Sequence, residues 1–113
     1  MQYAHREENG LVVFQLSGNL LAETDRDNIA REVKNYLDKG FVHFLFDLTQ
    51  LKHINSTGLG IFISLYARIK DTEGDMVLCN PSSHIRNLLL ITKLDTVFKI
   101  EDDMAVARAL LKA

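Results

Sequence analysis

The 113-residue sequence has a single cysteine, a formal charge of only −2 and no hydrophobic run long enough to cross a membrane. Cys79 alone cannot form a disulfide within the chain. The near-balance of acidic and basic residues gives no electrostatic reason to bind nucleic acid or an anionic membrane surface. No secretory leader precedes the first predicted strand. We therefore expect a cytoplasmic protein with no nucleic-acid partner and no direct membrane contact.

The usual patterns of catalytic, metal and cofactor sites are missing as well. The four histidines have no metal-ligand spacing: His5, His43, His53 and His84. Gly58 and Gly60 match a dinucleotide-binding loop only in part, because the third glycine and the following acidic residue are absent. No base can be placed beside Ser56 for nucleophilic catalysis. We predict no catalytic residue, no metal and no cofactor, and we do not expect an enzyme.

The hydrophobic pattern that is present predicts one α/β domain over residues 1–113. We expect strands at residues 2–7, 11–17, 41–47, 76–79 and 97–100, and helices at about 22–39, 56–71, 83–92 and 104–112. Asn9 and Gly10 favour a hairpin turn. Strands that then alternate with helices predict a mostly parallel sheet with an antiparallel N-terminal edge hairpin and about four helices.

Several local features are expected within this fold. Gly18 should end the second strand, and residues 48–53 should form a polar turn. His43, in an apolar strand, is predicted to be a hydrogen-bonded core residue, and Cys79 a structural thiol at the end of a buried strand.

The sequence Asn-Ser-Thr-Gly-Leu-Gly at residues 55–60 stands at the start of the most apolar helix. Ser56 or Thr57 is expected to cap that helix by accepting from a free backbone N–H group. Gly58 and Gly60 each cost about 1 kcal/mol relative to alanine inside a helix. Two glycines here indicate that a neighbouring element, a phosphate or a partner protein approaches the backbone closely.

Four segments together resemble the STAS domain family, and within it the bacterial anti-sigma factor antagonists: residues 16–18, 44–48, 54–60 and 93–100. Residues 54–60 are similar to the family's signature loop, and the resemblance covers nearly the whole chain. It implies phosphorylation of Ser56 by an anti-sigma factor that is also a serine kinase of the histidine-kinase-like ATPase fold. Thr57 is the alternative acceptor. A phosphatase would reset Ser56, and the unphosphorylated protein would bind the anti-sigma factor and free the sigma factor.

The resemblance also implies a partner-binding surface around the signature loop, formed by Leu20, Leu21, Asn55, Ser56, Thr57, Gly58 and Leu59. Two positions depart from the family pattern. Asn55 replaces the usual Asp, and Asn19-Leu20-Leu21 stands where many members carry an acidic pair. Three alternatives remain at this point. Ser56 could serve only as a helix cap, and the chain could be an accessory subunit of a lipid or anion transporter or a small-ligand sensor.

Overall fold

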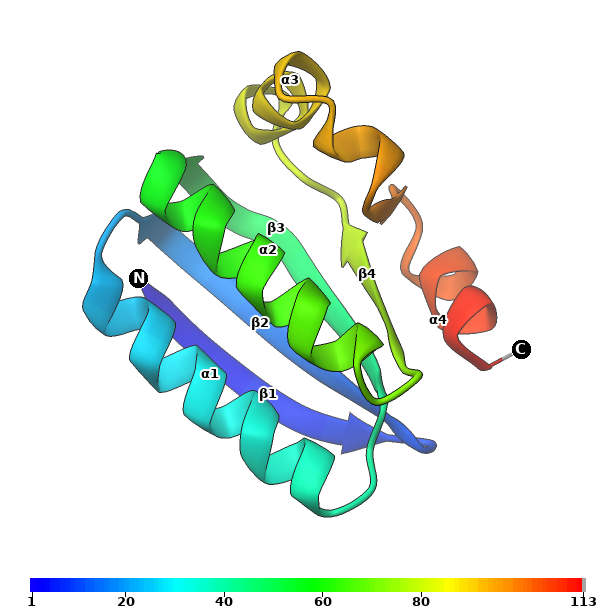
Figure 1. Cartoon of the computed structure of the whole chain (residues 1–113). Coiled ribbons are helices and arrows are strands. Elements are labelled where there is room, and N and C mark those ends of the chain that lie inside the picture. The colour runs from blue at the N-terminus through cyan, green and yellow to red at the C-terminus, as the bar shows by residue number, and fades with distance from the viewer. Residues whose placement is uncertain (113) are drawn as a thin grey trace.

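Five strands form one sheet in the order β1-β2-β3-β4-β5 in the computed structural model, which describes residues 1–112 (Figure 1). The strands are β1 (Gln2–Glu8), β2 (Leu11–Leu20), β3 (His43–Ile54), β4 (Asp75–Cys79) and β5 (Lys99–Glu101). The helices are α1 (Glu23–Asp38), α2 (Ser56–Lys70), α3 (Ser83–Ile91) and α4 (Met104–Lys112), with a short 3₁₀ turn, η1 (Leu94–Thr96), before β5.

The sheet has the predicted mixture of strand directions. β1 and β2 pair antiparallel, and the other neighbours pair parallel. Asn9 and Gly10 form the hairpin turn with φ of 51° and 88°, the positive values that such a turn requires. The α/β fold with an antiparallel N-terminal edge and four helices is therefore confirmed.

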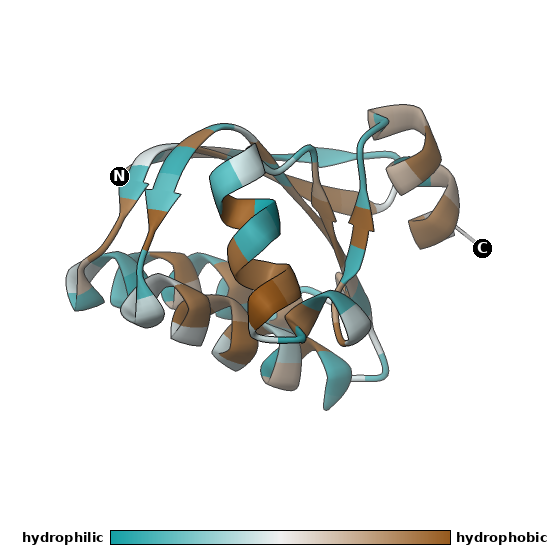
Figure 2. Cartoon of the chain, turned by 90° about the horizontal axis from the view of Figure 1, so that it is seen from above, coloured by the Kyte–Doolittle hydropathy of each residue, from teal (hydrophilic) through white to brown (hydrophobic). Residues whose placement is uncertain are grey.

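Helices cover the sheet on both faces (Figure 2). One core packs α1, α2 and α3 against the sheet, and its largest side chains are Phe14, Phe44, Phe46 and Phe62. A second, smaller core lies under α4 and contains Leu11, Val13, Leu45, Val77, Cys79, Ala107 and Leu111. Because β2, β3 and β4 contribute side chains to both cores, their sequences are almost continuously apolar.

The polar turn predicted at residues 48–53 is wrong, because β3 continues through it to Ile54. Leu48, Leu51 and Ile54 are all buried, although strict alternation would not place every third residue on one face. The register between β2 and β3 shifts twice in this region, and each shift adds a residue to β3. These bulges change the spacing of the buried residues along β3 from every second to every third residue. The sequence therefore does not show the alternation expected of a strand.

Three other predicted element bounds are wrong. β3 starts at His43 and not at Phe41. β2 does not end at Gly18 but passes through it, with φ of 83°, and ends at Leu20. Val97 and Phe98 lie outside the last strand, which starts at Lys99. All three differences affect short segments, and only the one in β2 bears on the functional site, because it brings the end of β2 beside the end of β3.

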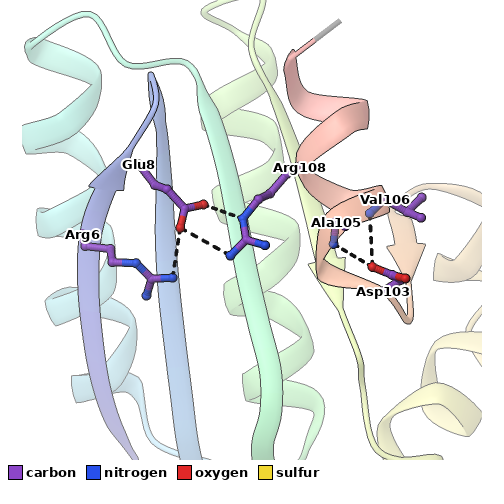
Figure 3. Close-up of polar contacts among 6 residues, drawn as sticks. All are labelled: Arg6, Glu8, Asp103, Ala105, Val106 and Arg108. Carbon is purple, nitrogen blue, oxygen red and sulfur yellow. Dashed lines mark hydrogen bonds and ion pairs between the residues drawn. The ribbon is translucent and has the colours of Figure 1, made fainter.

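The edge strand β1 is tied to helices on both faces. His5 Nδ1 lies 2.6 Å from Tyr36 Oη, and its Nε2 lies 2.5 Å from Glu32 Oε2, both on α1. Glu8 accepts from Arg108 of α4 (Nε to Oε2, 2.5 Å), as Figure 3 shows. The Arg108 hydrogen bond holds the pKa of the Glu8 carboxyl below its ordinary value.

Cys79 is fully buried under α4, as predicted for a structural thiol. Burial, followed by the charge of Asp47, raises the pKa of this thiol to about 11. The prediction that His43 is a hydrogen-bonded core residue is wrong, because the residue is only half-buried. Its Nδ1 atom is buried but has no hydrogen-bond partner within residues 1–112.

Candidate functional site

The start of α2 lies at the carboxyl edge of the parallel strands, beside the start of α1 (Figure 1). Leu20 at the end of β2 pairs in register with Ile54 at the end of β3. Only Leu21 and Ala22 then precede α1, and only Asn55 precedes α2. Two helix N-termini, each with free N–H groups and a partial positive charge, therefore lie at the same edge of the sheet.

Asn55 is the N-cap of α2, which corrects the prediction that Ser56 or Thr57 would be the cap. Its side-chain Oδ1 accepts from the backbone N–H of Gly58 at 3.0 Å, and its backbone carbonyl accepts from Leu59 N at 2.9 Å. Its Nδ2 donates to the Leu21 carbonyl at 3.3 Å. The amide thus caps α2 and also holds the loop that leads into α1.

This second hydrogen bond gives Asn55 a role that the family's usual aspartate could not fill. Either residue can cap a helix through a side-chain oxygen. Only the amide also carries N–H donors, one of which bonds the Leu21 carbonyl. The replacement therefore removes a negative charge from the site without removing the cap.

Gly58 and Gly60 differ in what surrounds them. A Cβ atom at Gly58 would lie 2.5 Å from the Leu20 carbonyl oxygen and 3.1 Å from Ile54 Cβ, so the end of β2 requires glycine there. A Cβ atom at Gly60 would meet only Arg26 Nη2, at an ordinary 3.8 Å. The close approach of a neighbouring element, the end of β2, explains why residue 58 is glycine. Packing within the domain does not explain why residue 60 is glycine.

Ser56 is the first residue of α2, and its side chain is exposed. Within residues 1–112 its hydroxyl takes part in no hydrogen bond, and neither does that of Thr57, which is half-buried. The hydroxyl of Ser56 is thus free for chemistry or contact from outside, next to N–H groups that favour a negative charge.

The seven residues predicted to bind a partner divide by burial. Leu20, Gly58 and Leu59 are buried, so their side chains are not available to a partner in this conformation. Leu21 is 45% exposed, Asn55 and Ser56 are exposed, and Thr57 is half-buried. We call Leu21, Asn55, Ser56 and Thr57 the Ser56 surface, and only these four remain candidates for direct contact.

Arg26, in the first half of α1, is a residue that the sequence analysis missed. Its guanidinium lies beside Gly60 of α2, one turn after Ser56. Its Nε is buried and has no hydrogen-bond partner among the described residues. A cation near a helix N-terminus is unfavourable, and that was the one signal in the sequence that could have identified it.

Metal-binding and cavity features are sparse in the described part of the chain. No cluster of three or more metal-ligating side chains occurs within residues 1–112. A hollow of about 290 Å³ lies over β1, β2 and β3, lined by residues that include Gln2, Gln15, Asp47 and Gln50. Most of these side chains are exposed or half-buried, so the hollow is a surface feature.

No helix in the described residues has both the length and the apolar character needed to cross a membrane.

Comparison with known proteins identifies one family and several relatives. The model of the STAS domain family matches residues 2–107. The BtrV protein of Bordetella bronchiseptica is 24% identical over 104 residues, which cover 92% of this chain and 89% of BtrV. The anti-sigma-B factor antagonist of Listeria monocytogenes is 24% identical, with coverages of 90% and 88%.

A solved structure shares the fold at lower sequence identity. The anti-sigma factor antagonist SpoIIAA in its unphosphorylated form is 16% identical and superposes with a TM-score of 0.84, covering 98% of this chain and 96% of that one. The phosphorylated form of the Bacillus protein is 17% identical, covers 96% and 97% of the two chains, and superposes with a TM-score of 0.75.

Proposed function

The chain belongs to the STAS domain family, and on that basis we propose that it is an anti-sigma factor antagonist whose binding is controlled by phosphorylation of Ser56. In the unphosphorylated state it binds an anti-sigma factor through the Ser56 surface and so frees the sigma factor. Phosphorylation prevents that binding, and a phosphatase restores it. The protein acts as a binding module in the cytoplasm and catalyses no reaction itself.

The observation that carries the proposal is the free, exposed hydroxyl of Ser56 at the first position of α2. A kinase must reach the acceptor hydroxyl, and Ser56 is more accessible than the half-buried Thr57. Because Asn55 performs the capping, Ser56 has no structural task that a phosphate would disturb. The alternative that Ser56 serves only as a helix cap therefore loses its basis.

The energies favour a switch for binding over a switch for folding. A phosphate at the start of α2 brings roughly −2 of charge to free N–H groups, and this interaction stabilises the phosphorylated helix by up to about 2 kcal/mol. The modified domain should therefore remain folded. At an interface, the same charge costs several kcal/mol to desolvate unless a basic group meets it. Since each ~1.4 kcal/mol weakens binding tenfold, the interface is where phosphorylation has its effect.

The partner that fits the proposal is an anti-sigma factor with serine kinase activity and the histidine-kinase-like ATPase fold. A pull-down from the source cells with the unmodified protein as bait should retain such a kinase. A retained membrane transporter would support the accessory-subunit alternative instead. A bound small molecule in the purified protein, detected by mass spectrometry, would support the sensor alternative.

The acceptor itself is tested with the retained kinase and ATP. Intact-mass measurement should show one added phosphate on the wild-type and Thr57→Ala proteins and none on Ser56→Ala. Phosphate that persists on folded Ser56→Ala would place the acceptor elsewhere and refute the proposed site. Ser56→Ala should still bind the kinase, because the proposal assigns the hydroxyl to phosphate acceptance.

A further inference from the structure

We propose that Arg26 forms an ion pair with the phosphate on Ser56, so that the phosphorylated side chain is held against α1. The inference rests on the proposed function only in taking Ser56 as the phosphorylated residue. It assigns to Arg26 the recognition of a phosphate monoester within the same chain.

Arg26 has unused hydrogen-bonding capacity. Its Nε is buried without a partner, and its guanidinium is absent from the ion pairs formed within residues 1–112. A buried N–H group without a partner is costly, and arginine is well suited to bind the oxygens of a phosphate in pairs. The guanidinium of this half-buried residue is therefore free to pair with a nearby anion.

The electrostatic setting of Arg26 also calls for an anion. The residue lies in the first turn of α1, where the helix dipole disfavours a cation, and its guanidinium lies beside the second turn of α2. Glu23 and Asp25 lie in the first turn of α1, yet neither forms an ion pair with Arg26. The phosphate would bring to this edge a negative group that the helix N-termini favour and with which Arg26, left unpaired by Glu23 and Asp25, can pair.

The separation of Arg26 and Ser56 has an upper limit that the two side chains can span by changing rotamers. Arg26 Nη2 lies 3.8 Å from the place where a Cβ atom at Gly60 would be. Ser56 precedes Gly60 by four residues, and positions with that spacing on a helix have Cβ atoms about 5–6 Å apart. Nη2 is therefore within about 10 Å of Ser56 Cβ, and a flexible arginine and an extended phosphoserine can close the rest. The absence of a side chain at Gly60 leaves the path between them open.

This pairing changes what a partner meets after phosphorylation. The guanidinium neutralises part of the added charge and draws the phosphate toward α1. The two starts of α1 and α2 become linked by an ion pair in addition to the Asn55–Leu21 hydrogen bond. Phosphorylation would thus stiffen the Ser56 surface as well as charge it.

The test places phosphoserine at position 56 during translation, using a phosphoserine-charged suppressor tRNA, so no kinase is needed. The second ionisation of the phosphate is then followed by ³¹P NMR. An ordinary phosphoserine titrates near pH 6, and an adjacent cation lowers that midpoint. We expect the midpoint to be about one pH unit lower with Arg26 present than in Arg26→Gln. Arg26→Lys, which keeps the charge but loses the planar fork, should fall between them.

Arg31→Gln is the matched control, since it removes the same charge from an exposed position farther along α1, where Arg31 donates to Asn28. It should leave the midpoint unchanged. Equal midpoints with Arg26 intact and in Arg26→Gln, or equal shifts in Arg26→Gln and Arg31→Gln, would overturn the inference. His53 and Lys52 at the end of β3 are present in every variant, so their charges do not affect the comparison. If the phosphate titration does not depend on Arg26, the proposed function still stands. If no kinase phosphorylates Ser56, the NMR result on the ion pair between Arg26 and the phosphate still stands.

Discussion

Replacing Gly58 by alanine should destabilise the domain, whereas the same change at Gly60 should stabilise it. The new methyl carbon at position 58 would lie 2.5 Å from the Leu20 carbonyl oxygen, a backbone atom held in β2. Ile54 Cβ, 3.1 Å away, blocks a shift in the other direction. Overpacking of this kind costs about 1–3 kcal/mol, and the gain in helix propensity offsets up to about 1 kcal/mol. With the full offset, we expect a net loss of up to about 2 kcal/mol.

At Gly60 the methyl group would make only an ordinary contact with Arg26 Nη2, at 3.8 Å. The gain in propensity is then unopposed and should be about 0.5–1 kcal/mol. Urea denaturation of the two variants and the wild type, with equal slopes, measures both effects. If the Gly58→Ala protein were as stable as the Gly60→Ala protein, the close approach of β2 to α2 would be refuted.

Three further predictions concern other parts of the molecule. Asn55→Ala should lose about 1 kcal/mol as a missing cap, whereas Ser56→Ala should change the unfolding free energy by less than about 0.5 kcal/mol, again by urea denaturation. The Cys79 thiol should not react with a disulfide reagent at neutral pH unless the protein unfolds, because its pKa is about 11 and it is buried. The pKa of Glu8 in the folded protein lies below its ordinary value of 4.5. The ion pair with Arg108 therefore stabilises the fold above pH 4.5, and this stabilisation is lost as the pH falls through the pKa of the folded state. Glu8→Gln should therefore cost up to about 1 kcal/mol at pH 7 and nothing once the pH is below the folded pKa, and a cost that persists in acid would contradict the ion pair.

The sequence was sufficient to predict the fold because most strands and helices have clear periodicity. It was not sufficient where geometry departs from periodicity. The two bulges that shift the β2–β3 register change the spacing of Leu48, Leu51 and Ile54, so the end of β3 resembled a turn. Gly18 keeps a positive φ inside β2, which no alternation pattern indicates.

The position of the candidate site was predictable, but its internal arrangement was not. Residues 55–60 identified the start of α2 correctly. Three adjacent residues, Asn55, Ser56 and Thr57, are all good caps, and only the three-dimensional structure shows that Asn55 accepts from Gly58. Arg26 could not be connected with Ser56 from the sequence, because contact between α1 and α2 depends on how both helices pack on the sheet.

The central claim is that a negative charge at Ser56 switches binding without unfolding the domain, and Ser56→Asp tests it most directly. Calorimetric titration with the captured anti-sigma factor, together with thermal melting, gives both quantities. An acidic residue in the first turn of α2 suits the positive helix end, so the variant should melt at or slightly above the wild-type temperature. Its dissociation constant should rise roughly 5- to 150-fold, equivalent to about 1–3 kcal/mol. Unchanged affinity in a protein that melts like the wild type would place Ser56 outside the interface and contradict the account.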